Sequence, residues 1–174
     1  MSLTEQESAQ QVVFDVNVFI DALVTGRDSF ESWPSPPPTS GHFAADCVGI
    51  VNDAVEFSLW LSPHILTNIE RVLESPASQD GFEWETQHVE DYLEVLVEIS
   101  TASGGAVITP AQAVTDCADY EDNRILELAL ACQAVIIVSN DSDLLHMSPW
   151  RGIPILPPRD FTARVDASRR VRRR

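Results

Sequence analysis

The chain has 174 residues, 44% of them hydrophobic, which is the length of one ordinary domain and enough apolar material for a sizeable core. It holds 27 acidic residues against 11 arginines and no lysine, and five of the arginines lie among the last six residues. Such an acidic body repels a phosphate backbone, which argues against a simple nucleic-acid-binding module but not against an enzyme that recruits cations.

The chain shows no sign of export, of membrane insertion or of a site for a soft metal. No stretch approaches the roughly 20 apolar residues of a membrane span, and the polar start MSLTEQESAQ resembles neither a signal peptide nor a transit peptide. The cysteines Cys47, Cys117 and Cys132 lack CxxC spacing, and the histidines are scattered, so neither a disulfide framework nor a zinc site is expected. We therefore expect a cytoplasmic protein with reduced cysteines.

The N-terminal half predicts two strands separated by helices. In order, the expected elements are a buried strand at 11–16, a helix at 19–24, a helical face at 42–55, a strand at 56–61 and a helix from Pro63 to about Glu74. Ser62 before Pro63 is an N-cap followed by proline at the first helical position. The proline-rich segment 27–41 is a loop, and we expect a surface insertion rather than a wall of the site.

The C-terminal half continues the alternation of helices and strands. The expected elements are a helix at 84–100, a short strand at 106–109, a helix at 122–133, a strand at 134–139, a short helix at 142–147, a strand at 153–156 and a helix at 160–165. This alternation implies βαβ units and a buried parallel sheet. We expect one domain over 11–167, a flexible N-terminus at 1–10 and an Arg-rich tail at 168–174 that is disordered when free.

Acidic and amide side chains gather where two expected strands end and where one helix begins. They are Asp15 and Asn17 after the first strand, Asn140, Asp141 and Asp143 after the 134–139 strand, and Asp116, Asp119, Glu121 and Asp122 at the start of the 122–133 helix. In an open parallel sheet, ligands bind beyond the carboxyl ends of the strands. If these strands are neighbours, Asp15, Asp122 and Asp141 converge at one rim.

Carboxylates brought this close repel one another, so they need a cation or must take up protons. Oxygen donors of this kind suit Mg²⁺ or Mn²⁺, which also bridge to phosphate oxygens. Such an ion can polarise a phosphodiester and offset charge on the leaving oxygen. Asn17 can orient Asp15 beside it.

Each acidic cluster also fits a purely structural role. Asp15, Asp119 and Asp141 can each cap the helix that follows, and Asn140 can lie in a turn. An aspartate inside the apolar run VVFDVNVFI is harder to explain in this way, because a buried charge without a partner is costly. Taken together, the three positions favour a metal site.

Two motifs give the chain a resemblance to the PIN-domain nucleases, in the branch of bacterial toxin–antitoxin toxins. VVFDVNVFIDAL resembles the family's opening strand with its Asp-x-Asn, and DYEDNRILELALACQAVIIVSNDSDLL resembles its Asp-x-x-Asp-Asn helix, strand and Thr-x-Asp-x-Asp-Leu-Leu end. The closing RGIPILPPRDF matches as well, so the similarity covers most of residues 11–161, with the segment 27–41 as an insertion.

The resemblance implies a three-layer α/β fold with a twisted parallel sheet between helices. It also implies cleavage of single-stranded RNA with Mg²⁺ or Mn²⁺, by a homodimer that binds an antitoxin protein. Carried over by position, Asp15, Asp122 and Asp141 take the metal-ligand and catalytic roles, while Asp119 and Asp143 lie at the edge of the site. Ser139 stands where the family often has threonine, and it keeps the hydroxyl.

One position departs from the family pattern. The family commonly has a glutamate on the helix after the second strand, and the matching stretch here is NIERVL, with Asn68 at that place. Glu70 lies two residues on, about 200° around a helix, and would normally face elsewhere. Either Glu70 reaches the site through a local shift, Asn68 serves as a neutral ligand, or Glu70 is simply a solvated partner of Arg71.

Two functional questions stay open, one raised by Asn68 in place of a glutamate and one by the arginine-rich end of an otherwise acidic chain. A catalytically weakened PIN-like domain that acts as a binding or regulatory partner is the alternative to a nuclease, whereas a phosphotransfer receiver is disfavoured because the chain has no lysine. The tail arginines either contact RNA or form a plain solvated terminus. They are Arg169, Arg170, Arg172, Arg173 and Arg174.

Overall fold

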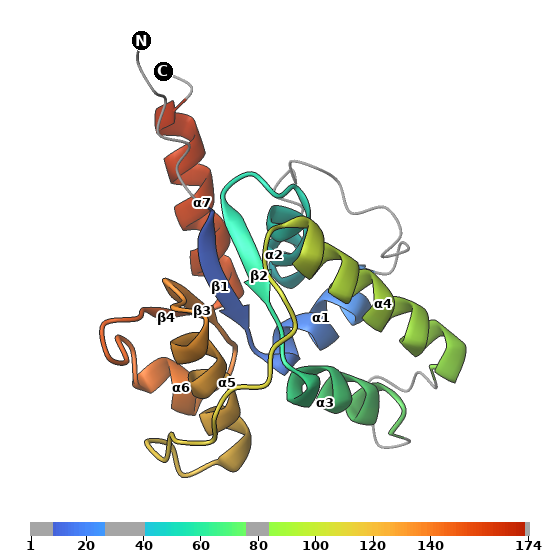
Figure 1. Cartoon of the computed structure of the whole chain (residues 1–174). Coiled ribbons are helices and arrows are strands. Elements are labelled where there is room, and N and C mark those ends of the chain that lie inside the picture. The colour runs from blue at the N-terminus through green and yellow to red at the C-terminus, as the bar shows by residue number, and fades with distance from the viewer. Residues whose placement is uncertain (1–8, 27–40, 76–83, 173–174) are drawn as a thin grey trace.

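The computed structural model describes residues 9–26, 41–75 and 84–172, and Figure 1 shows the arrangement of the elements. The strands are β1 (Gln10–Phe14), β2 (Phe57–Trp60), β3 (Ile136–Val138) and β4 (Ile155–Leu156). The helices are α1 (Val16–Gly26), α2 (Phe43–Asn52), α3 (Pro63–Leu73), α4 (Thr86–Ala102), α5 (Tyr120–Ala131), α6 (Ser142–His146) and α7 (Pro158–Arg172).

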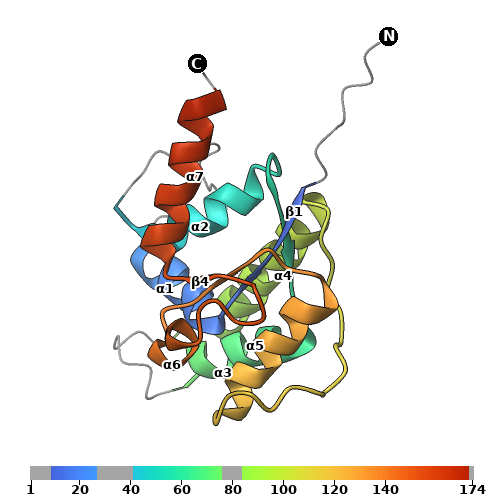
Figure 2. The same ribbon diagram turned by 90° about the vertical axis from the view of Figure 1, so that its left-hand side faces the viewer.

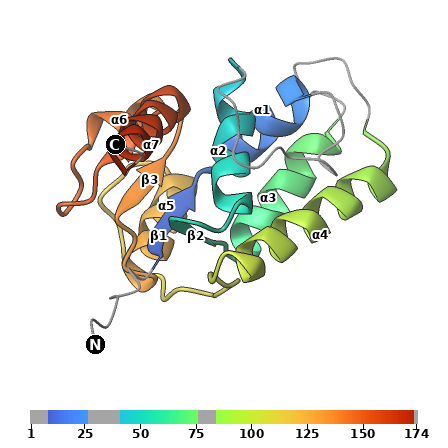
Figure 3. The same ribbon diagram turned by 90° about the horizontal axis from the view of Figure 1, so that it is seen from above.

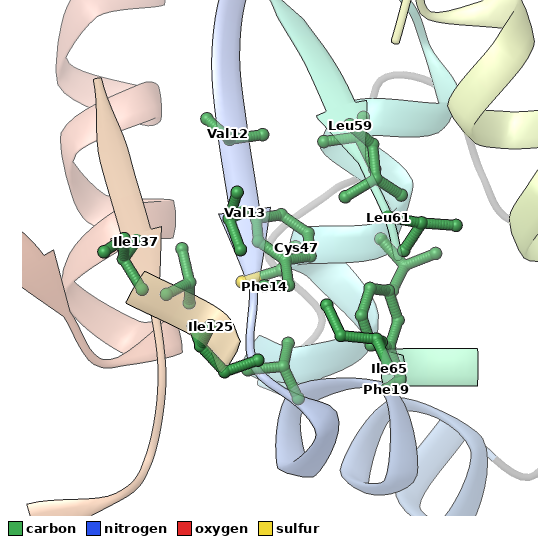
Figure 4. Packing of buried hydrophobic residues seen from close by; sticks show 14 of the residues in the cluster. Val12, Val13, Phe14, Phe19, Cys47, Leu59, Leu61, Ile65, Ile125 and Ile137 are labelled. Atoms are coloured by element: carbon green, nitrogen blue, oxygen red, sulfur yellow. The ribbon is translucent and has the colours of Figure 1, made fainter. Parts of the chain in front are cut away.

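The four strands form one parallel sheet in the order β2-β1-β3-β4. The predicted parallel sheet is therefore confirmed, and β1 lies at its centre with a hydrogen-bonded neighbour on each side. Val12 pairs with Leu59 of β2 and with Ile136 of β3. Figure 4 shows the side chains of β1 between those of β2 and β3, which is why the C-terminal part of this strand, Val12 to Phe14, is apolar and fully buried.

Helices cover both faces of the sheet, as expected for an α/β fold. On one face, Phe14 meets Phe161 of α7 with the ring centroids 5.6 Å apart, and Phe57 meets the same ring at 5.2 Å. On the other face, the Ser58 hydroxyl donates to the Ser103 carbonyl just after α4, at 2.7 Å. Figure 2 shows α2 and α7 on one side of β1 and α4 and α5 on the other. Figure 3 shows α3 and α4 together beyond β2, with α6 and α7 at the opposite side.

Two local signals set the helices next to β2. The Ser62 hydroxyl accepts from the Ile65 amide at 3.3 Å and Pro63 opens α3, so the predicted cap is confirmed. Helix α4 ends at the glycine pair, where Gly104 has a φ of +89°. At Gly105 a Cβ would lie 1.8 Å from the Leu59 carbonyl oxygen, so only glycine lets this segment pass so close to β2.

Two sequence-based expectations about the backbone are wrong. The expected strand at 106–109 is only a single bridge between Val107 and Leu61, since Pro110 follows immediately and offers no amide to extend the ladder. The tail is not disordered as far as Arg172, because α7 runs seven residues past its expected end at Val165. The predicted insertion 27–41 and flexible N-terminus lie almost wholly outside the described residues.

None of the described helices is both long and apolar enough to cross a membrane.

Candidate active site

The three predicted carboxylates belong to segments that follow β1, open α5 and follow β3, and these elements are labelled in Figure 1. Asp15 directly follows β1, and its backbone amide donates to the Val138 carbonyl at the end of β3, at 2.8 Å. Asp141 follows β3 and caps α6, while Asp122 lies in the first turn of α5. We call these three carboxylates the acidic rim. The adjacency of β1 and β3 brings Asp15 and Asp141 near each other, and Asp122 lies close enough for the charges of both to act on it.

The carboxylate of Asp15 is held by three hydrogen bonds. Its Oδ1 accepts from the Val16 amide at 2.7 Å, and its Oδ2 accepts from the Ser139 hydroxyl at 2.6 Å and from Asn17 Nδ2 at 2.9 Å. Ser139 is fully buried, and its oxygen also accepts from the Asp141 amide at 2.9 Å. The Ser139 hydroxyl therefore links two of the three carboxylate-bearing residues, and Asn17 orients Asp15.

Two of the predicted site residues, Asp141 and Asp119, also cap helices. A structural role at these positions is therefore compatible with the proposed functional role. Asp141 Oδ1 accepts from the amides of Asp143 and Leu144 at 2.7 and 3.4 Å. Asp119 Oδ1 accepts from the Glu121 amide at 2.7 Å and caps α5. Capping fixes one carboxylate oxygen in each case and fixes the rotamer of the side chain.

Two carboxylates of the acidic rim, Asp15 and Asp122, have raised pKa values. Burial raises the pKa of Asp15, and the nearby charge of Asp141 raises it further, although the hydrogen bonds from Ser139 and Val16 oppose the rise. Burial also raises the pKa of Asp122, to about 6, and the charges of Asp141 and Asp15 add to that rise. The Cys117 thiol donates to Asp122 Oδ2 at 3.2 Å and only partly offsets the effect. The charges of these carboxylates therefore repel one another, and a cation among them would stabilise their charged forms.

The chemistry of this rim fits a hard divalent cation. The donors are carboxylate oxygens, and Asp15 and Asp122 are each only 8% exposed. Within the described residues, no group of three or more His, Cys, Asp or Glu side chains is placed so that it could hold a metal ion. An ion held here would therefore rely on water or substrate oxygens as well, which is the usual manner for Mg²⁺.

Comparison with known proteins gives the family. Residues 11–143, more than half of the chain, match the PIN domain. The chain belongs to the PIN-domain family. PIN domains are generally nucleases, and they typically use divalent metals, which agrees with the acidic rim. No curated protein matches the chain.

At Asn68 the sequence resemblance led us to expect a glutamate, and this residue contacts polar side chains. Asn68 is buried, and its Oδ1 accepts from Arg71 Nε and Nη2 at 3.2 and 3.0 Å. Its Nδ2 lies 2.5 Å from Glu121 Oε2 and 2.8 Å from His64 Nε2. Both ends of the amide are therefore bonded to neighbouring side chains. Glu70 forms no side-chain hydrogen bond or ion pair within the described residues.

This PIN domain contains groups near the site that the sequence motifs did not single out. His64 lies one helical turn before Asn68 on α3, and it bonds to Glu121 at the start of α5. The spacing of four residues between His64 and Asn68 was the only available signal, and it gives no hint of Glu121. The two helices meet through polar side chains beside the rim.

The remaining predicted residues lie at the margin or elsewhere. The Asn140 amide donates to Asn17 Oδ1 at 3.2 Å, and its side chain donates to Asp21 at 2.9 Å. Asp143 is exposed in the first turn of α6. Asp116 accepts from Trp150 and Arg151 instead of joining the rim, and these hydrogen bonds lower its pKa.

The described tail arginines lie at the opposite end of the sheet from the acidic rim. Arg169 donates to Asp53 at 2.7 Å and to Glu56 at 3.4 Å, and Arg172 donates to Glu56 at 3.1 Å. Glu56 immediately precedes β2, so this cluster lies where the strands begin, as Figure 1 shows. Arg170 is exposed on the same stretch of α7, while Arg173 and Arg174 lie outside the described residues.

Proposed function

We propose that this protein is a metal-dependent endoribonuclease that cleaves single-stranded RNA, with Asp15, Asp122 and Asp141 as the ligands of Mg²⁺ or Mn²⁺. The observation that carries the proposal is the placement of Asp15 and Asp141 after the neighbouring strands β1 and β3, close enough to the largely buried Asp122 for their charges to act on it. Carboxylates that repel one another at the carboxyl ends of parallel strands are typical of a site completed by a cation. When bound, the ion polarises a phosphodiester and offsets charge on the leaving oxygen.

The residues around the rim have separate tasks in this proposal. Ser139 and Asn17 hold Oδ2 of Asp15, so the direction of its lone pairs is set before any ligand arrives. Capping of α6 holds Asp141 in the same way. Asp119, Asn140 and Asp143 support the margin, where they contribute charge or position rather than direct ligation.

We further propose that the protein works in the cytoplasm as the toxin of a toxin–antitoxin pair, as a homodimer inhibited by an antitoxin protein. The support is the family membership together with the absence of a membrane-crossing helix among those described. Co-expression with the product of an adjacent small gene tests this role. A stable complex that suppresses cleavage supports it, and growth inhibition without any partner that relieves it counts against it.

The bonding of Asn68 supports a second candidate, a PIN domain with weakened catalysis that serves as a binding or regulatory partner. An amide with its oxygen on Arg71 and its nitrogen on Glu121 adds no negative ligand to the rim. The candidates differ in their affinity for metal, because a weakened domain binds Mn²⁺ feebly.

Cleavage of a labelled single-stranded RNA with Mn²⁺ or Mg²⁺ tests the nuclease proposal, alongside calorimetric titration with Mn²⁺. We expect activity that chelation abolishes and that falls at least about 100-fold in Asp15→Asn. Asp91→Asn is the matched control, because Asp91 is an exposed carboxylate on α4 whose hydrogen bond from Gln87 an asparagine also accepts. Activity that survives both chelation and Asp15→Asn contradicts the proposal, and tight RNA binding without cleavage favours the second candidate.

A further inference from the structure

An exposed aromatic ring lies beside the acidic rim. Tyr120 is the first residue of α5, two positions before Asp122, and 54% of it is exposed to solvent. The other exposed large hydrophobic residues of the described chain are aliphatic (Val55, Val107, Leu130, Val135 and Val171). Aromatic side chains usually bury most of their surface, so an open ring next to a reactive site calls for a ligand.

The ring is supported from beneath by a buried cation. The Cζ of Arg124 lies 4.5 Å from the centroid of the Tyr120 ring, over its face. Arg124 is only 9% exposed, and its Nη2 donates to Glu127 Oε1 at 2.7 Å. That same oxygen accepts from the backbone amides of Ala113 and Val114. The Arg124 guanidinium is therefore held in a fixed position. Its attraction for the face of the Tyr120 ring limits the motion of that ring.

A second contact, between the rings of His64 and Tyr120, helps to orient the Tyr120 ring. The His64 ring lies 6.0 Å from that of Tyr120, and the two planes cross at 78°, so the histidine does not stack on the tyrosine. His64 is itself held by Glu121 and Asn68. The phenol oxygen of Tyr120 makes no hydrogen bond in the described part of the chain, whereas the buried Tyr92 donates to the Phe19 carbonyl. Tyr120 therefore offers ring surface rather than a polar contact.

Net charge narrows the class of ligand. The chain carries a formal charge of −16, and the acids nearest to Tyr120 are Asp119, Glu121 and Asp122. A polyanionic strand gains little affinity from such a surface through its phosphates. A nucleobase is uncharged and has a π-face, so it can bind a tyrosine ring without bringing a phosphate against the rim.

We propose that Tyr120 stacks a nucleobase of single-stranded RNA, next to the phosphate that is cleaved at the acidic rim. This inference rests on the proposed nuclease function and names how that site holds its substrate. The ring supplies the affinity that the acidic surface cannot supply, and Arg124 keeps the ring in place. Because stacking does not depend on the identity of the base, Tyr120 contributes affinity more than sequence preference.

Binding of a fluorescein-labelled single-stranded RNA of seven nucleotides, followed by anisotropy in EDTA, tests the proposal without cleavage. We expect Tyr120→Ala and Tyr120→Leu to weaken binding about 5- to 30-fold, which is about 1–2 kcal/mol at 1.4 kcal/mol per tenfold change. Tyr120→Phe keeps the ring and stays within about twofold. Leu130→Ala, an exposed apolar residue near the other end of α5, is the matched control and leaves binding unchanged.

An abasic scan of the same RNA separates stacking from a change in structure. One abasic position should weaken binding to the wild-type chain as much as Tyr120→Ala does, and should cause no further loss in that variant. Loss of affinity in Tyr120→Phe equal to that in Tyr120→Ala, or no abasic position coupled to Tyr120, overturns the proposal. An RNA affinity that is the same in the wild type and in the Tyr120 variants also overturns the proposal. The ring would then be a contact for a protein partner.

The outcomes also separate this inference from the nuclease proposal. If RNA binding depends on Tyr120 but the protein cleaves no RNA, the stacking proposal is supported and the nuclease proposal is contradicted. Cleavage of RNA by a Tyr120→Ala variant with an unchanged KM defeats stacking and leaves the nuclease intact. Competition by adenosine monophosphate as strong as that by the RNA shows that a free nucleotide, not a strand, is the ligand and contradicts the proposal.

Discussion

The two charged regions of this molecule differ in whether their charges are balanced. Near the carboxyl ends of the strands, the charges of Asp15 and Asp141 act on Asp122, and together with burial they raise its pKa to about 6. At the amino ends, Arg169 pairs with Asp53 and Glu56 at the start of β2. The arginines stabilise the fold through partners within the chain. Burial raises the pKa values of Asp15 and Asp122, so the charged forms of these two side chains cost stability, and this difference from the paired arginines is what supports the proposed metal site.

The largest expected effect separates stability from activity at Asp122. Asp122→Asn should lower RNA cleavage by at least about 100-fold and raise the stability of the metal-free protein by about 2 kcal/mol at about pH 7.5. The folded chain holds the Asp122 proton more tightly than the unfolded chain, because burial raises its pKa from 3.8 to about 6. The charged carboxylate therefore costs stability above about pH 6, and this cost disappears as the pH falls toward 4.

Thermal denaturation in EDTA at about pH 7.5 and about pH 4.5 measures this effect. The gain in melting temperature from Asp122→Asn should be clear at the higher pH and small at the lower one. An equal gain at both pH values, or a loss at the higher one, would mean that the rim is not strained by its own charge. Asp91→Asn again serves as the control.

A smaller effect is expected at Ser139, which connects Asp15 to the Asp141 backbone. Ser139→Ala removes a hydrogen bond to a buried carboxylate, so the pKa of Asp15 rises further and cleavage falls about tenfold. Ser139→Thr keeps the hydroxyl and should stay within about threefold of the wild type. Cleavage rates and calorimetric Mn²⁺ affinities of both variants check this, and equal losses in the two would show that packing rather than the hydrogen bond matters.

The smallest functional effect is expected in the paired region. Arg169→Ala removes the ion pairs to Asp53 and Glu56 and should cost about 1 kcal/mol of stability, with cleavage unchanged. The slope of RNA affinity against salt concentration should also stay constant, since these arginines lie away from the rim. Urea denaturation and a salt titration give both numbers, with Arg170→Ala as the comparison. A slope that falls by about one per arginine removed would assign the tail to RNA binding instead.

Local chemistry made much of the fold predictable. The Ser62–Pro63 signal placed the start of α3, and the apolar runs around Val12 and Ile137 placed the two central strands. The positions of Asp15 and Asp141 after two apolar strands indicated that these two acids lie near each other, because ligands of a parallel sheet bind beyond the carboxyl ends of its strands.

Contacts between distant segments were not predictable in this way. The Ala106–Thr109 segment has the composition of a strand, but strand pairing depends on a neighbour that composition cannot reveal. The order in α7 up to Arg172 depends in part on Asp53 and Glu56, which lie more than one hundred residues earlier in the chain. The bond between Asn68 and Glu121 spans 53 residues, so the motif alone left Asn68 and Glu70 as equal candidates.

The central position of β1 also determines when the site exists. Asp15 is made early in translation, but the Ser139 hydroxyl that holds it lies 124 residues later, and Asp141 follows only with β3. A ribosome-bound chain that ends before β3 therefore contains Asp15 and Asp122 but lacks both Ser139 and Asp141. The acidic rim is therefore complete only after most of the polypeptide has been made, so the proposed metal site forms late in synthesis.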